Sequence, residues 1–184
     1  YGFIVVSDSP YCEQGYESLP PCFMQVPGAK DVGVEFFSFS KTYNMTGWRV
    51  GFAVGNKDLL AALVQIKSTV DTGIFMPIQH AAIAALTGPD EELIVPSKEV
   101  YHYRRKVMIE GLRSKGYEVF DGGATFYLWV KVPKGKTSSE TASTLMDQGV
   151  VVTPGHGFGA HGEGYIRLSL TVPEERLKEA LNRF

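Results

Sequence analysis

The sequence has few cysteines, no large excess of charge and no long apolar run. Cys12 and Cys22 are its only cysteines, too few for a disulfide-dense scaffold or a zinc ribbon, and both are expected to be reduced thiols. No apolar stretch approaches the roughly 18 residues that span a bilayer, and the first residues lack a signal-peptide pattern. We therefore expect no membrane association and a cytoplasmic location.

The chain also lacks an excess of charge of one sign, with 18 basic and 20 acidic residues and a formal net charge of −2. These charges are spread along the chain, so no basic face is available to a nucleic acid. The glycine-rich stretch 154–164 carries His156 and His161 but no cysteine or carboxylate set at ligand spacing, and it predicts a loop with no metal site. A G-x-S-x-G elbow is absent, which removes the nucleophile of an α/β-hydrolase.

What is present in the first half is a pattern of apolar segments. Residues 2–7 predict a fully buried parallel strand, and since nothing precedes it, we expect the chain to start in the middle of a fold. Residues 34–39 and 49–54 predict two more strands. The connection between them is too short for a parallel crossover, so this pair should be antiparallel, with Lys41 on the connecting loop.

Helical periodicity follows, with an expected helix after the cap Asn56, a short one over residues 78–86 and a long one from about residue 96 to 114. The polar face of the long helix, which includes Arg104 and Arg105, is expected to be solvated. Beyond it the pattern predicts strands and helices of an α+β unit, with strands at 117–120, 125–132, 150–153 and 165–170 and helices near 139–147 and 173–183. We place a domain boundary near residue 95, giving domains 1–95 and 96–184.

One run could carry chemistry, from Ser38 through Lys41 and Arg49 to Gly51. An imine-forming lysine must lose its charge, which apolar neighbours and a nearby cation such as Arg49 favour. The planar guanidinium of Arg49 is suited to a phosphate, and Gly47 and Gly51 let the backbone approach one. The run indicates imine formation with pyridoxal phosphate, in which Lys41 holds the aldehyde and Ser38 and Arg49 bind the phosphate.

Three further residues are candidates, each with an ordinary alternative. Asp8 and Tyr11 follow the first strand, where ligands of open α/β sheets bind, although Asp8 could simply begin a turn before Pro10. Arg167 stands within a predicted strand. It is either an outward-facing solubilising cation or an inward guanidinium that needs a carboxylate, which a substrate could provide.

With these residues the chain resembles the C-terminal half of a class I/II aminotransferase of the fold-type I pyridoxal-phosphate superfamily. The likeness covers essentially the whole chain and is most specific in the Ser-x-Ser-Lys and Gly-x-Arg-x-Gly elements of residues 38–51. Flanking stretches, at residues 25–35, 123–129 and 162–167, are most similar to the LL-diaminopimelate aminotransferases. The implied fold is α/β, with part of a large-domain sheet (two parallel strands plus one antiparallel) followed by a small α+β domain.

The resemblance also implies a role for each matching residue. Lys41 would bind the cofactor and transfer the proton between the substrate Cα and the cofactor, and Asp8 would pair with the pyridine nitrogen. Tyr11 would donate to the ring's phenolate oxygen, Ser38 and Arg49 would hold the phosphate, and Arg167 would bind the α-carboxylate of an amino-acid or 2-oxo-acid substrate. A homodimer of the full-length protein is implied as well.

The resemblance further implies that an N-terminal half is missing, with the glycine-containing phosphate loop and the aromatic residue that stacks on the ring. We therefore expect a partial polypeptide that is inactive alone and associates through its exposed first strand. Three alternatives stay open: a pyridoxal-phosphate-dependent lyase or decarboxylase of the same fold, a non-catalytic sensing or dimerisation module, and a degraded structural fragment that only folds.

Overall fold

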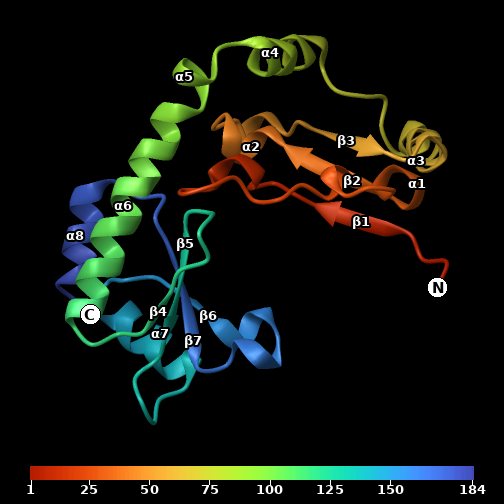
Figure 1. The fold of residues 1–184 in the computed structure, drawn as a ribbon. Coiled ribbons are helices and arrows are strands. Elements are labelled where there is room, and N and C mark those ends of the chain that lie inside the picture. Colours follow the sequence, from red (N-terminus) through yellow and green to blue (C-terminus); the bar gives the residue numbers. More distant parts are fainter. The chain divides into compact units, whose positions relative to one another are not determined.

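The computed structural model describes every residue from Tyr1 to Phe184, and the chain divides into two compact units, Tyr1–Lys98 and Glu99–Phe184. Each unit has its own sheet, three-stranded in the first and four-stranded in the second (Figure 1). The predicted α/β class is confirmed. Assigning the units to a cofactor-binding domain 1–95 and a small domain 96–184 stays a prediction. None of the helices combines the length and apolar character needed to cross a bilayer.

The first sheet has the strand order β1-β2-β3, with bounds Val5–Asp8, Gly33–Ser38 and Gly51–Gly55. β1 pairs with β2 in parallel and β2 pairs with β3 antiparallel, as the sequence predicted. The carboxyl ends of β1 and β2 therefore meet the amino end of β3 at one edge of the sheet. Ligands of open α/β sheets bind at this kind of edge.

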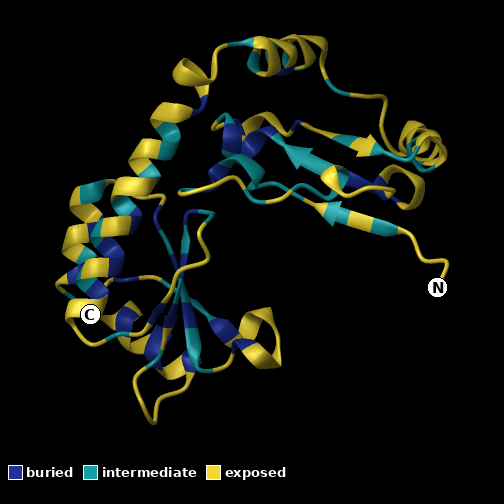
Figure 2. Cartoon of the chain, viewed as in Figure 1, coloured by how far each residue is buried: buried dark blue, intermediate teal, exposed yellow.

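β1 is shorter and far less covered than the sequence predicted. Ile4 and Val6 are 58% and 65% exposed, so the full burial indicated by the apolar pattern is not found, whereas the exposed first strand that the resemblance implied is present. β1 has a neighbour on one side only, β2, and the face onto which Ile4 and Val6 point is also open to solvent. Figure 2 shows the strand as a mixture of intermediate and exposed residues.

Helices complete the first unit. The longest, α3 (Lys57–Val70), begins where expected, because the Asn56 side chain accepts hydrogen bonds from the backbone amides of Asp58 and Leu59. A core cluster of the first unit joins Ala82 of α4 (Met76–Thr87) to three residues near the turn between β2 and β3: Phe39, Met45 and Val50. Two short helices, α1 and α5, span Ala29–Val32 and Asp90–Leu93.

The second unit is a four-stranded antiparallel sheet with the order β4-β5-β7-β6. Its strands are Val119–Phe120, Tyr127–Lys131, Tyr165–Ser169 and Thr153–Pro154, and its helices α6, α7 and α8 are Val95–Ser114, Ser138–Asp147 and Glu174–Leu181. In β5 and β7 buried residues alternate with half-exposed ones, the pattern of a sheet covered on one face. α6, whose first residues belong to the first unit, passes so close to α8 that a side chain on Gly111 would collide with Leu181.

The prediction of a solvated polar face on α6 is wrong at Arg105. This arginine is only 5% exposed and forms an ion pair with Asp121, and its neighbour Arg104 donates to the backbone oxygen of Leu170. Both partners lie just beyond strand ends, Leu170 after β7 and Asp121 after β4. Burial of an arginine requires such a partner, because an unpaired buried charge is costly.

Candidate active site

Lys41 lies in the connection between β2 and β3, as the sequence predicted, but within a one-turn helix, α2 (Phe39–Thr42). A single turn cannot sustain itself, since helix formation has a costly nucleus and the terminal amides and carbonyls lack intrahelical partners. Side chains provide these partners. The Ser38 hydroxyl accepts from the Ser40 amide, and the Thr46 hydroxyl donates to the Ser40 carbonyl.

Gln14 supplies a further contact to the same turn. Its Nε2 donates to the carbonyl oxygen of Lys41 at 3.1 Å, and the Gln14 side chain is almost fully buried. The Lys41 side chain is half-buried, and its ammonium forms no hydrogen bond or ion pair. The lysine is thus anchored through its backbone while its amine stays available.

Arg49 adopts a left-handed backbone conformation with φ of 55°, just before β3. Such a conformation is unfavourable for a residue with a Cβ and is tolerated mainly in glycine, asparagine and aspartate. Its Nη1 donates to the Thr46 carbonyl at 2.9 Å, whereas no acidic side chain pairs with it and the side chain is exposed. Strained residues of this kind concentrate at functional sites.

Asp8 and Tyr11 lie at the same edge of the sheet as Ser38. Asp8 is the last residue of β1 and is exposed, and its carboxylate forms no hydrogen bond or ion pair. Tyr11 precedes a 3-10 turn, η1 (Cys12–Gln14), and is half-buried. The strand register pairs Asp8 with Phe36 and Ser38 with Gly51, so the end of β1, the start of α2 and the start of β3 border one edge.

Sequence reasoning missed Glu35, a fully buried carboxylate on the central strand β2. It accepts hydrogen bonds from the Ser9 hydroxyl at 2.6 Å, the Ser7 hydroxyl at 3.3 Å, and the amides of Phe23 and Met24 at 3.1 and 2.9 Å. Burial works to raise the pKa of Glu35, but these four hydrogen bonds outweigh it and hold the pKa below its ordinary value. A carboxylate between Val34 and Phe36 was the signal available in the sequence.

Arg167 is in the second unit, on the half-exposed face of β7, and thus not among the buried residues of that strand. Its guanidinium carbon lies 4.2 Å from the centre of the Tyr127 ring and 4.5 Å from that of Phe158, whose own ring contacts Trp129 edge-on. Arg167 makes no ion pair. Aromatic rings near a guanidinium stabilise its positive charge by cation–π attraction. The N–H groups, which lie in the plane of the guanidinium, remain available to bind a carboxylate.

The glycine-rich segment 154–164 forms two 3-10 turns, η4 (Gly155–Phe158) and η5 (Ala160–Gly162). His156 Nδ1 lies 3.0 Å from the buried Ser138 hydroxyl, which also donates to Glu163. The Ser138 amide also donates to Glu163. The hydrogen bonds from the Ser138 amide and hydroxyl keep the pKa of the Glu163 carboxylate below its ordinary value. Both ends of the segment are therefore attached to the start of α7.

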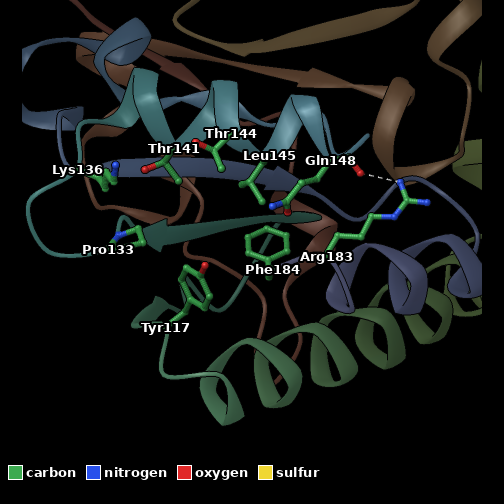
Figure 3. Close-up of a pocket in the computed structure, with 9 residues that line it drawn as sticks. All are labelled: Tyr117, Pro133, Lys136, Thr141, Thr144, Leu145, Gln148, Arg183 and Phe184. Atoms are coloured by element: carbon green, nitrogen blue, oxygen red, sulfur yellow. Dashed lines mark hydrogen bonds between the residues drawn. The ribbon is translucent and has the colours of Figure 1, made fainter.

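A pocket of about 210 Å³ opens elsewhere in the second unit (Figure 3). Its wall includes α7 and the chain terminus, where Arg183 Nη1 donates to the Gln148 carbonyl at 2.9 Å. The lining residues are Tyr117, Pro133, Lys136, Thr141, Thr144, Leu145, Gln148, Arg183 and Phe184. None of the residues predicted to be functional lines this pocket, so it does not locate the site.

Comparison with known proteins connects this arrangement to a family. The model of the family "Aminotransferase class I and II" matches residues 1–184. The chain belongs to this family. It is 54% identical to the LL-diaminopimelate aminotransferase of Aquifex aeolicus and 51% identical to that of Halothermothrix orenii, in each case over its full length.

Solved aminotransferase structures share the fold. A mutant aspartate aminotransferase of Thermus thermophilus superimposes with a TM-score of 0.90 at 31% identity, covering 99% of this chain and 50% of that one. The aromatic aminotransferase of Pyrococcus horikoshii gives 0.93 at 29% identity, with 98% and 49% covered. The chain spans about half the length of these aminotransferases and of the curated relatives, of which it covers 48% and 47%.

Proposed function

We propose that this class I/II aminotransferase chain provides the lysine-bearing side of a pyridoxal-phosphate site. The observation that carries the proposal is a set of side chains along one sheet edge that have no partner of opposite charge. These are a carboxylate, an amine and a guanidinium, on Asp8, Lys41 and Arg49. Oppositely charged groups that stay apart at the ligand-binding edge of a sheet are suited to a ligand that is itself both anionic and cationic.

The donors fit the cofactor. Ser38 keeps its hydroxyl proton free, because the hydroxyl oxygen accepts from the Ser40 amide. Arg49 keeps most of its guanidinium N–H groups free, and together the two can hold a phosphate. The strain at Arg49 supports this assignment, since a left-handed arginine has no packing reason in an exposed turn.

Each residue then has a defined task. Lys41 would hold the cofactor aldehyde and move the proton at the substrate Cα, and Asp8 would pair with the pyridine nitrogen and keep it protonated. Tyr11 would donate to the ring oxygen, while Arg167 would bind the α-carboxylate of the substrate and thereby orient the Cα–H bond. The cofactor, when bound, supplies the electron-withdrawing ring that stabilises negative charge at Cα.

The substrates proposed are an amino acid and a 2-oxo acid, with LL-diaminopimelate as the specific amino acid. The relatives at 54% and 51% identity, both named LL-diaminopimelate aminotransferase, support this choice. For the full-length protein we propose a homodimer. The cytoplasmic location stays a prediction.

A trapping experiment tests the proposed cofactor site. Pyridoxal phosphate is added to the 184-residue chain, the imine is reduced with borohydride, and peptide mass spectrometry locates the adduct. We expect the adduct at Lys41 and a near-visible absorbance band that reduction abolishes, because an amine held beside groups that bind the cofactor condenses faster than a lysine on the open surface.

The matched variants are Lys41→Ala and Lys57→Ala, the second being an exposed lysine of α3. Lys41→Ala should lose both signals and Lys57→Ala should keep them. Labelling spread evenly over the lysines of the wild-type chain would refute the proposal.

A lyase or decarboxylase of the same fold would retain the same cofactor residues. Product analysis of the full-length protein with and without a 2-oxo-acid acceptor separates these reactions. A transaminase forms product only in proportion to the acceptor, whereas a lyase or decarboxylase continues without it.

A further inference from the structure

Gln14 is the most conspicuous polar residue that the proposed chemistry leaves unused. It is 1% exposed, and its Oε1 is buried without a hydrogen-bond partner. Leaving a carbonyl oxygen unpaired inside a protein costs on the order of 1–3 kcal/mol. A leucine or methionine would fill the same volume without that cost, so packing alone does not account for a glutamine at this position.

The hydrogen bonds that Gln14 does form connect two proposed cofactor residues. Its backbone amide donates to the carbonyl of Tyr11 at 2.9 Å, closing the η1 turn. Its side-chain Nε2 donates to the carbonyl of Lys41 at 3.1 Å. Gln14 therefore hydrogen-bonds to the backbone of Tyr11, which carries the phenol, and to the backbone of Lys41, which carries the amine.

The Lys41 carbonyl is a group that needs such a donor. It stands in the last turn of a four-residue helix, where carbonyls have no intrahelical partner. Of the neighbouring carbonyls, Phe39 accepts from the Tyr43 amide and Ser40 accepts from the Thr46 hydroxyl. Gln14 is the donor that fixes the lysine's own peptide group.

We propose that Gln14 is a positioning residue for Lys41, holding the lysine-bearing turn at a fixed distance from the Tyr11 backbone so that amine and phenol address the same cofactor. This inference rests on the proposed function, because it assigns both residues to one ligand. Gln14 itself acts through the backbone and touches neither the amine nor the cofactor. Its effect is therefore on the placement of Lys41 and not on the chemistry of the ε-amine.

The test is the variant Gln14→Met, which keeps the side-chain length and removes both the donor and the unpaired acceptor. Pyridoxal phosphate with borohydride is the probe, and the measured quantity is the ratio of adduct at Lys41 to adduct at Lys57. We expect this ratio to fall about fivefold, with faster amide hydrogen exchange in a peptide covering residues 39–43 and unchanged exchange in α3.

A purely structural role predicts a different result. It would lower the melting temperature and increase exchange throughout the first unit, with no selective change at residues 39–43. Gln65→Met, an exposed glutamine of α3, is the matched control and should leave the ratio unchanged.

The outcomes separate the two proposals. If wild-type labelling shows no preference for Lys41, the proposed function fails. If the wild-type chain prefers Lys41 and Gln14→Met keeps both the preference and the slow exchange of residues 39–43, the positioning role is overturned. If Gln14→Met does not fold, Gln14→Asn replaces it, because its side chain is one methylene too short to reach the Lys41 carbonyl. A fall in the ratio of Lys41 adduct to Lys57 adduct then supports the positioning role, and an unchanged ratio overturns it.

Discussion

At the scale of single residues, the buried carboxylate of Glu35 organises the strand ends that carry the site. It accepts hydrogen bonds from two hydroxyl groups at the end of β1 and from two backbone amides of the turn η2 (Phe23–Gln25). The first strand and the loop after it are thus attached to the central strand at one point. Asp8 lies between Ser7 and Ser9, the two residues whose hydroxyls bind this carboxylate.

Glu35 makes stability depend on pH in a defined direction. Its pKa in the folded chain is lower than the ordinary value of about 4.3, so folding favours the ionised form. The resulting stabilisation is complete above that ordinary value and is lost as the pH falls from there through the lowered pKa. Urea denaturation of the wild-type chain at a series of pH values should show this loss.

Glu35→Gln should flatten that acidic decline, because the amide does not titrate. It should also lower the free energy of unfolding at neutral pH by about 2–4 kcal/mol, since its NH₂ group faces donors that then lack an acceptor. Glu110→Gln, on an exposed position of α6, is the control and should leave the curve intact. An acidic decline of equal slope in wild type and Glu35→Gln would contradict this account.

At the scale of elements, the connection from α2 through η3 (Thr46–Trp48) to β3 combines a short helix with a strained exit at Arg49. Arg49→Gly removes the strain, worth about 1–2 kcal/mol, although the extra freedom of glycine in the unfolded chain offsets about 0.5–1 kcal/mol. We expect an unchanged or slightly higher melting temperature together with weaker retention of pyridoxal phosphate. Stability does not fall although cofactor retention does, because the Arg49 side chain contributes to binding the phosphate and not to stabilising the fold.

Arg49→Ala is the matched variant, which loses the guanidinium but keeps a Cβ in the left-handed conformation. It should retain the cofactor as poorly as Arg49→Gly and be less stable than it. Equilibrium dialysis with pyridoxal phosphate and thermal denaturation measure the two properties. Undiminished retention in both variants would remove Arg49 from the phosphate site.

The elements also show what the sequence can reveal. Local signals predicted α3 from its Asn56 cap, α4, α6, and the antiparallel pairing of β2 with β3, because a short connection leaves no other choice. The sequence motif singled out Ser38, Lys41 and Arg49. Their exact roles stay predictions.

Other features depended on contacts between distant parts of the chain and were not predictable locally. A one-turn helix at Lys41 requires the Gln14 and Thr46 side chains, and neither is part of a helical pattern. Burial of Arg105 requires Asp121, which lies beyond the end of α6. The exposure of β1 depends on which strands are beside it, which periodicity does not report.

At the scale of the whole molecule, the two units differ in how completely their strands are covered. In the second unit the buried positions of β5 and β7 are matched by buried residues of α6, α7 and α8. In the first unit β1 has one unpaired side and exposes Val6 to solvent, as the preceding residues expose Phe3 and Ile4. Such an edge is a template for pairing with another chain.

We therefore expect concentration-dependent association of the 184-residue chain through β1. Val6→Lys places a charge on the exposed strand and should shift size-exclusion profiles towards the monomer. Val64→Lys is a matched control, since Val64 on α3 has the same 65% exposure but no free strand edge. A monomer at every concentration, or equal effects of both variants, would contradict association through β1.

The one-sided pairing of β1 also allows the first sheet to be extended. Backbone N–H and C=O groups along Val5–Asp8 that face away from β2 can accept a strand supplied by a separate molecule, by the same hydrogen bonding that joins consecutive strands of one chain. An added peptide would then form a fourth strand beside β1. Val6→Lys should weaken this strand addition as well as self-association.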